Sequence, residues 1–151
     1  MHAPRMTNLT SSPVYKPMSE IERYLASSPL PKTILELVKL RVSQMNGCAF
    51  CVDMHSHDLK KLGEADERMW SVAVWREAPF FTEQERAALD LAEAATRLDR
   101  DGVPDDVWDT AAKHFDEETL MALVAAIATI NAWNRYGVTL RLVPGPGTSR
   151  R

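Results

Sequence analysis

Long apolar runs are scarce in the sequence, which predicts neither export nor insertion into a membrane. Residues 1–17, MHAPRMTNLTSSPVYKP, contain no apolar core of the kind that a signal peptide requires. The most apolar stretch, Leu120 to Ile130, is shorter than the roughly 20 residues that cross a bilayer. We therefore expect a cytoplasmic protein with no membrane partner.

Clusters of like charge are also missing. The 18 Lys and Arg and the 21 Asp and Glu are interspersed, and the net charge is −3. A nucleic-acid-binding domain gathers its basic residues on one surface. The only cluster of basic residues here is the pair of arginines in the terminal SRR, residues 149–151. The sequence therefore predicts no nucleic-acid partner.

No segment alternates apolar and polar residues for long, and no repeat of 20–50 residues is present. Helical spacing recurs instead, for example at Ile34, Leu37, Val38, Val42 and Met45. The sequence predicts an all-α fold with about six or seven helices in one domain. We expect an N-terminal arm over residues 1–18, a helical domain over 19–144 and a C-terminal tail over 145–151.

Capping signals and breakers divide this domain into helices. The motifs SEIE, beginning at Ser19, and TEQE, beginning at Thr82, fit capping boxes that open two helices. Gly47 suits the position just after a helix, and Asp116 is expected to cap a long helix that ends at Pro144. The other predicted helices run from about Cys48 to Gly63, from Glu64 to Trp75, and from Pro104 to His114.

The helix over Leu120 to Trp133 is apolar nearly all round. Such a helix is either central in a fold or shared with another subunit. Asn131 and Asn134 lie on or beside it, and buried amides need partners. We expect these amides at a subunit contact, and the cysteine site near a subunit boundary.

Cysteine is scarce, and both copies stand together in NGCAFCVDMHSH as Cys48 and Cys51. A structural disulfide is disfavoured in the reducing cytosol, so the pair needs another explanation. If Cys51 lies in the first turn of a helix, backbone N–H groups and the helix dipole favour its thiolate. His55 follows by four residues, which places its imidazole on the same helix face. The spacing therefore favours a reactive thiol with a proton partner.

Glu36 and His57 are further titratable residues near this pair in the sequence. Glu36 lies in the preceding helix among apolar residues. It is either an ordinary exposed carboxylate, with Lys32 and Lys39 within helical reach, or a residue that faces the cysteine helix. If that helix packs against the cysteine helix, Glu36 instead faces His55, and spacing alone leaves both arrangements open. His57 points elsewhere and pairs with Asp53 as a solvated couple.

Other interpretations of the cysteine stretch remain open at this point. Cys48, Cys51, His55 and His57 offer metal-ligating atoms, but zinc sites usually draw their ligands from two separated pairs. A second possibility is a role without redox chemistry, either a decarboxylase or a binding scaffold. A third is that both cysteines are simply buried apolar residues. Which cysteine would attack first is also left open.

The pattern Glu-x11-Cys-x2-Cys-x3-His, formed by Glu36, Cys48, Cys51 and His55, resembles the alkylhydroperoxidase D-like (AhpD-like) branch of the carboxymuconolactone decarboxylase family. The stretches VKLRVSQMNGCAFCVDMHSHDLKKLG and WREAPFFTEQERAAL are similar to its core. The resemblance extends from about Ile34 to Leu98, is weaker over 128–135 and is absent before Ser19. One departure is Phe50, since the hydroperoxidase that gives the branch its name has a histidine there.

The resemblance implies an all-α homo-oligomer, commonly a trimer or hexamer, and a thiol peroxidase without cofactor or metal. It implies that Cys51 and Cys48 form a disulfide cycle and that Glu36 and His55 relay protons. The expected partners are a hydroperoxide substrate and an external dithiol reductant, lipoyl-type or thioredoxin-like. The alternatives are a general thiol–disulfide oxidoreductase and a decarboxylase-like enzyme that lacks redox chemistry.

Overall fold

The computed structural model describes residues 3–6 and 9–145, and within them it contains seven α-helices and no strand. The helices are α1 (Tyr15–Ser27), α2 (Lys32–Met45), α3 (Ala49–Lys61), α4 (Asp66–Ser71), α5 (Glu83–Arg97), α6 (Asp105–His114) and α7 (Glu117–Leu140), with 3-10 turns at Leu9–Ser11 and Val72–Val74. The all-α prediction is confirmed. In the described ranges, no helix is both long and apolar enough to cross a membrane.

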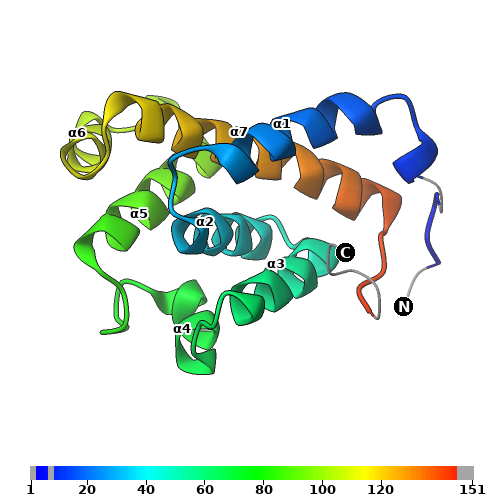
Figure 1. Cartoon of the computed structure of the whole chain (residues 1–151), viewed down its shortest axis with the longest axis horizontal. Helices are drawn as coiled ribbons and strands as arrows, with labels where there is room; N and C mark the ends of the chain where they lie inside the picture. The colour runs from blue at the N-terminus through cyan, green and yellow to red at the C-terminus, as the bar shows by residue number, and fades with distance from the viewer. Residues whose placement is uncertain (1–2, 7–8, 146–151) are drawn as a thin grey trace.

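Helix α2 lies at the centre of the fold and packs against α3, α5 and α7 (Figure 1). It is central because it is apolar on two sides. Val38 and Val42 join the larger cluster of buried residues, which includes both cysteines and much of α7. Leu37 and Leu40 join a second cluster with residues of α3 and α5. The core is thus divided by the helix that precedes the cysteines.

Two of the three predicted N-caps are confirmed. Thr82 and Glu85 form a reciprocal capping box at the start of α5, and the Asp116 side chain accepts a hydrogen bond from the Thr119 N–H in α7. The capping box at Ser19 is wrong, since α1 begins at Tyr15. The Tyr15 ring lies 5.8 Å from the ring of Trp133 in α7. This contact accompanies the earlier start of α1. Pro17 is tolerated in the first turn because a backbone N–H there would have no intrahelical acceptor, and proline has no N–H to leave unpaired.

Two other boundaries also differ from expectation. The segment predicted as a helix from Glu64 to Trp75 is shorter and changes to a 3-10 turn at Val72. Helix α7 stops at Leu140 rather than near Pro144, because Arg141 adopts a left-handed conformation with φ of 56°. The division into arm, domain and tail stays a prediction, and residues 146–151 of the tail lie outside the described residues.

A buried carboxylate connects α2 and α5 to the loop that separates α4 from α5. Glu93 accepts hydrogen bonds from Arg41 Nε at 2.6 Å, Trp75 Nε1 at 2.9 Å and Arg76 Nη1 at 2.5 Å. Burial opposes ionisation of Glu93, but the bonds from Arg76, Trp75 and Arg41 outweigh it and lower the pKa of this carboxyl group. Ionised Glu93 therefore stabilises the folded state.

We predict that Glu93 contributes to acid sensitivity. Because its pKa is lowered on folding, its stabilisation is complete above the unfolded value near 4.5 and is lost as pH falls through the folded value. The free energy of unfolding should therefore fall with pH below 4.5, and less steeply in Glu93→Gln. Urea denaturation at a series of pH values measures both slopes.

Glu77→Gln is the matched control, since it removes a carboxylate from the exposed surface of the same loop. A surface change of this kind alters the free energy of unfolding by about 0.5 kcal/mol or less. Identical acid slopes for Glu93→Gln and wild type would contradict the role assigned to Glu93.

Candidate redox site

A tight corner between α2 and α3 positions the two cysteines. Gly47 has φ of +68°, a left-handed conformation that glycine adopts without a side-chain clash. The chain then turns so that the Cys48 N–H donates to the Ser43 carbonyl at 3.0 Å. Cys48 is the N-cap residue of α3, and Cys51 lies in its first turn, as the sequence predicted.

The two sulfurs are joined in a disulfide, with the Cα atoms 5.3 Å apart. The Sγ of Cys48 also accepts a hydrogen bond from the Cys51 N–H at 3.3 Å. Both residues are buried, with exposures of 1% and 2%. The pair is therefore held at a helix N-terminus, where backbone N–H groups favour negative charge on sulfur, but beneath the protein surface.

Helix α7 passes directly over the sulfurs at Gly137. A Cβ at this position would lie 2.5 Å from Cys48 Sγ and 3.3 Å from Cys51 Sγ. Any larger residue would therefore collide with the disulfide. Glycine inside a helix lowers stability by about 0.5–1 kcal/mol relative to alanine, and the close approach of the sulfurs provides a structural reason for it here.

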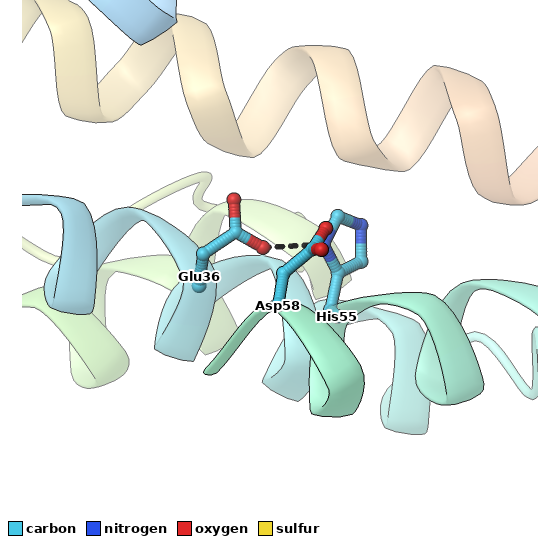
Figure 2. A group of neighbouring side chains, drawn as sticks. All are labelled: Glu36, His55 and Asp58. Atoms are coloured by element: carbon cyan, nitrogen blue, oxygen red, sulfur yellow. Dashed lines mark hydrogen bonds and ion pairs between the residues drawn. The ribbon is translucent and has the colours of Figure 1, made fainter. Parts of the chain in front are cut away.

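The carboxylate of Glu36 meets the imidazole of His55 across the interface between α2 and α3. His55 Nδ1 lies 2.6 Å from Glu36 Oε2 (Figure 2). The His55 side chain is 1% exposed and that of Glu36 is 12% exposed. The structure thus adopts one of the two arrangements left open by spacing. Nδ1 thus faces Glu36, and Nε2 of the same ring is buried.

Charged groups continue from Glu36 toward α1. Lys39 Nζ lies 4.0 Å from Glu36 Oε1 and 2.6 Å from Glu22 Oε2, and its side chain is 1% exposed. Trp133 Nε1 of α7 donates to Glu22 Oε1 at 3.0 Å. Lys39 is therefore part of the buried interior. Lys32 is also not a partner of Glu36, since its Nζ donates to the Leu25 and Ala26 carbonyls.

His57 stays apart from these groups. Its side chain is 61% exposed, and Nε2 lies 3.6 Å from Asp53 Oδ1. This arrangement agrees with the predicted solvated couple. The group that brings metal-ligating atoms together in the described residues is instead Glu36, His55 and Asp58, whose atoms lie within 4.8 Å of one another. The two carboxylates also have cationic neighbours in Lys39 and Lys61.

The amides of α7 hold the corner between α2 and α3. Asn46 Nδ2 donates to the Oδ1 atoms of Asn131 and Asn134, both at 2.9 Å. Asn134 Nδ2 donates to Ser43 Oγ at 3.0 Å. These bonds attach the end of α2 to α7 beside the disulfide, so the amides find their partners within the chain.

Three residues near the site were not singled out from the sequence as site residues. Asp58 lies three residues after His55, which places it on the same helix face. This spacing alone could have identified Asp58 as a neighbour of His55. Gly137 interrupts an otherwise strong helix, which often indicates close packing. Trp133 had no such signal, because its contact with Glu22 joins residues far apart in the chain.

Comparisons with known proteins agree with this geometry. The profile of the carboxymuconolactone decarboxylase family matches residues 13–94, beginning earlier than the motifs alone indicated. An uncharacterized protein from Bacillus subtilis strain 168, YdfG, is 42% identical over 125 residues, covering 83% of this chain and 85% of that protein. Alkyl hydroperoxide reductase AhpD from Methylocella silvestris is 42% identical over 65 residues, which cover 42% of this chain and 36% of that protein.

A solved structure extends the likeness to nearly the whole chain. A protein of unknown function from Agrobacterium tumefaciens, for which an antioxidant-defence role as AhpD has been suggested, superposes with a TM-score of 0.90. It is 39% identical and covers 95% of this chain and 99% of its own. The chain therefore belongs to the carboxymuconolactone decarboxylase family, within its AhpD-like branch.

Proposed function

We propose that this protein is a thiol peroxidase that reduces hydroperoxides through a cycle between the Cys48–Cys51 disulfide and the corresponding dithiol. The observation that supports it most directly is the disulfide at the N-terminus of α3, on the same helix as a buried His55 bonded to Glu36. Membership in a family that includes alkyl hydroperoxide reductase AhpD supports peroxidase chemistry.

In the oxidative half of the cycle, the Cys51 thiolate attacks one peroxide oxygen. An S–O bond forms, the O–O bond breaks, and the departing alkoxide takes a proton from His55. The Cys48 sulfur then attacks the sulfenic acid on Cys51, and water leaves with the Cys48 thiol proton. Two electrons pass from the two sulfurs to the peroxide, which yields one alcohol and one water.

In the reductive half, an external dithiol attacks Cys51, and Cys48 departs as a thiolate. The Cys51 N–H, which already points to Cys48 Sγ at 3.3 Å, stabilises that leaving group. The second thiol of the reductant then releases Cys51. Two local features favour attack on Cys51 with Cys48 as the leaving group. His55 follows Cys51 by one helical turn, and the Cys51 N–H faces the sulfur of Cys48.

Burial of the disulfide favours a slender reductant. Exposures of 1% and 2% leave little sulfur surface for a folded partner domain to contact. A lipoyl-type dithiol on a flexible arm requires a smaller local opening than direct docking of a thioredoxin-like protein. We therefore favour the lipoyl-type class among the two reductants considered.

The second candidate is a thiol–disulfide oxidoreductase that uses the same two cysteines on protein disulfides. Phe50 favours it, because a side chain without an exchangeable proton occupies the position between the cysteines next to Cys51. The two functions differ in the oxidant, so peroxide consumption separates them.

The cysteine pair is tested by single substitution. With tert-butyl hydroperoxide and dihydrolipoamide, wild-type protein should lose two free thiols per peroxide consumed and regain them on reduction. Cys48→Ser and Cys51→Ser should each reduce turnover to the background rate, because the disulfide can no longer form. Cys48→Ser should also retain a sulfenic acid at Cys51, detectable by dimedone labelling and mass spectrometry.

Full turnover in either cysteine variant would contradict the proposed disulfide cycle. Cysteine-dependent reduction of a protein disulfide without peroxide consumption would favour the oxidoreductase instead. Labelling at Cys48 in the Cys51→Ser protein would reverse the roles of the two cysteines.

The proton partner is tested with two histidines of the same helix. His55→Gln should slow peroxide consumption by about 100-fold or more, the usual range for loss of a general acid–base group. His57→Gln removes an exposed imidazole and should leave the rate within about twofold of wild type. Equal rates for both variants would contradict the assignment of His55.

Gly137 tests the space around the sulfurs. Alanine in a helix normally adds about 0.5–1 kcal/mol of stability relative to glycine. In the oxidised protein, Gly137→Ala should instead destabilise by about 1–3 kcal/mol, because its Cβ overlaps Cys48 Sγ. Urea denaturation of the oxidised form measures the change.

The matched control places Gly137→Ala in a Cys48→Ala/Cys51→Ala background, where the sulfurs are absent and alanine should be neutral or stabilising. This double-mutant comparison isolates the contact between Gly137 and the disulfide. An equal loss of stability in both backgrounds would show that other neighbours of Gly137 are responsible.

A further inference from the structure

Asp58 stands beside the Glu36–His55 pair with no role in the chemistry described so far. One oxygen of Asp58, one oxygen of Glu36 and one ring nitrogen of His55 lie within 4.8 Å of one another. Figure 2 shows both carboxylates turned toward the imidazole, Glu36 from α2 and Asp58 from α3. His55 therefore has a second acidic neighbour besides its hydrogen-bonded partner.

We propose that Asp58 is a positioning residue that keeps His55 protonated, so that His55 can donate a proton to the alkoxide leaving the peroxide. This inference rests on the proposed peroxidase function. An imidazolium is favoured by carboxylates within about 4–6 Å and disfavoured by burial. His55 is 1% exposed, so it needs more compensation than an exposed histidine would.

The need for a charged His55 follows from its surroundings. Ala49 and Phe50, which separate the cysteines, have no exchangeable side-chain proton. His57 is exposed and pairs with Asp53, so it is not part of the buried group. The proton for the alkoxide therefore comes from His55, and an unperturbed imidazole, with an ordinary pKa near 6.5, is mostly neutral at pH 7.

Glu36 by itself is partly neutralised. Lys39 Nζ lies 4.0 Å from its other oxygen, although Lys39 is closer to Glu22, at 2.6 Å. Asp58 also has a cation, Lys61, at 3.2 Å, but the Lys61 side chain is 53% exposed and is screened by water. The second carboxylate therefore adds negative charge that Lys61 cancels only in part.

Several other charged groups on the elements that contact α3 have partners of their own, including Arg41 of α2, which bonds to Glu93. The contacts are Arg135 of α7 with Asn131, Asp66 of α4 with Lys60, and Arg68 of α4 with Glu64 and Glu85. The charge near His55 is thus set by Glu36, Asp58, Lys39 and Lys61, with Glu22 behind Lys39.

Asp58→Asn tests the proposal, since it removes the charge and keeps nearly the same shape. The oxidised wild-type protein and variant are titrated by NMR, following the His55 ring protons, and no turnover is needed. The midpoint should move to lower pH by about one pH unit, because a stabilising negative charge is lost. This midpoint belongs to the coupled Glu36–His55 pair, and the alkaline limb of peroxide consumption should move in the same direction.

Three further variants complete the design. Asp58→Glu keeps the charge and should retain a midpoint near the wild-type value. Lys61→Met removes the competing cation and should move the midpoint to higher pH. Asp53→Asn removes a carboxylate on the same helix that faces His57, and it should leave His55 unchanged.

An unchanged His55 midpoint in Asp58→Asn would overturn the proposal. If Asp58→Asn does not fold, an unchanged midpoint in Lys61→Met would overturn it in the same way. Because the titration uses the oxidised protein, it separates this inference from the peroxidase assignment. A shifted midpoint in Asp58→Asn, with no peroxide turnover by the wild-type protein, would support the charge coupling and contradict the proposed peroxidase function.

Discussion

The corner at residues 46–48 is the constraint on which the site depends. A left-handed Gly47 ends α2, and the next residue begins α3 with its sulfur at the helix N-terminus. Because the turn is so short, α3 folds back along α2, and Glu36 and His55 meet although they are 19 residues apart. The amides Asn131 and Asn134 of α7 hold this corner through Asn46. A looser connection would separate Glu36 from His55.

The same geometry places the disulfide beneath α7. Gly137 provides the room that two sulfur atoms need against a helix backbone, and no other residue type offers it. The consequence is a protected disulfide that a bulky partner cannot reach without local opening. The contact between Gly137 of α7 and the sulfurs at the start of α3 thus limits access to the disulfide.

The second feature of the site is a series of titratable side chains in the interior between α1 and α3. Glu22, Lys39, Glu36, His55 and Asp58 follow one another from α1 through α2 to α3. Burying charged groups is costly unless each has a partner. Here Lys39 lies between the carboxylates of Glu22 and Glu36, and His55 lies between those of Glu36 and Asp58, so each of these groups has a polar neighbour.

The sequence by itself determined the helices and the local pairs. Periodicity predicted the all-α fold, and Thr82, Asp116 and Gly47 marked boundaries that depend on interactions within a few residues. The family resemblance implied a disulfide between Cys48 and Cys51, and their separation of three residues at the start of α3 brings the two sulfurs within reach. His55 at four residues, and the separate pairing of Asp53 with His57, follow from the same helical geometry.

Only the tertiary structure decided which of the remaining groups face one another. Glu36 could have lain on an outer face with its neighbouring lysines, and helix spacing has no information about packing partners. The burial of Lys39 against Glu22, the early start of α1 beside Trp133, and the close pass of Gly137 over the sulfurs all join residues distant in the chain. Such contacts depend on how α1, α2, α3 and α7 pack together, which the pattern within any single helix does not specify.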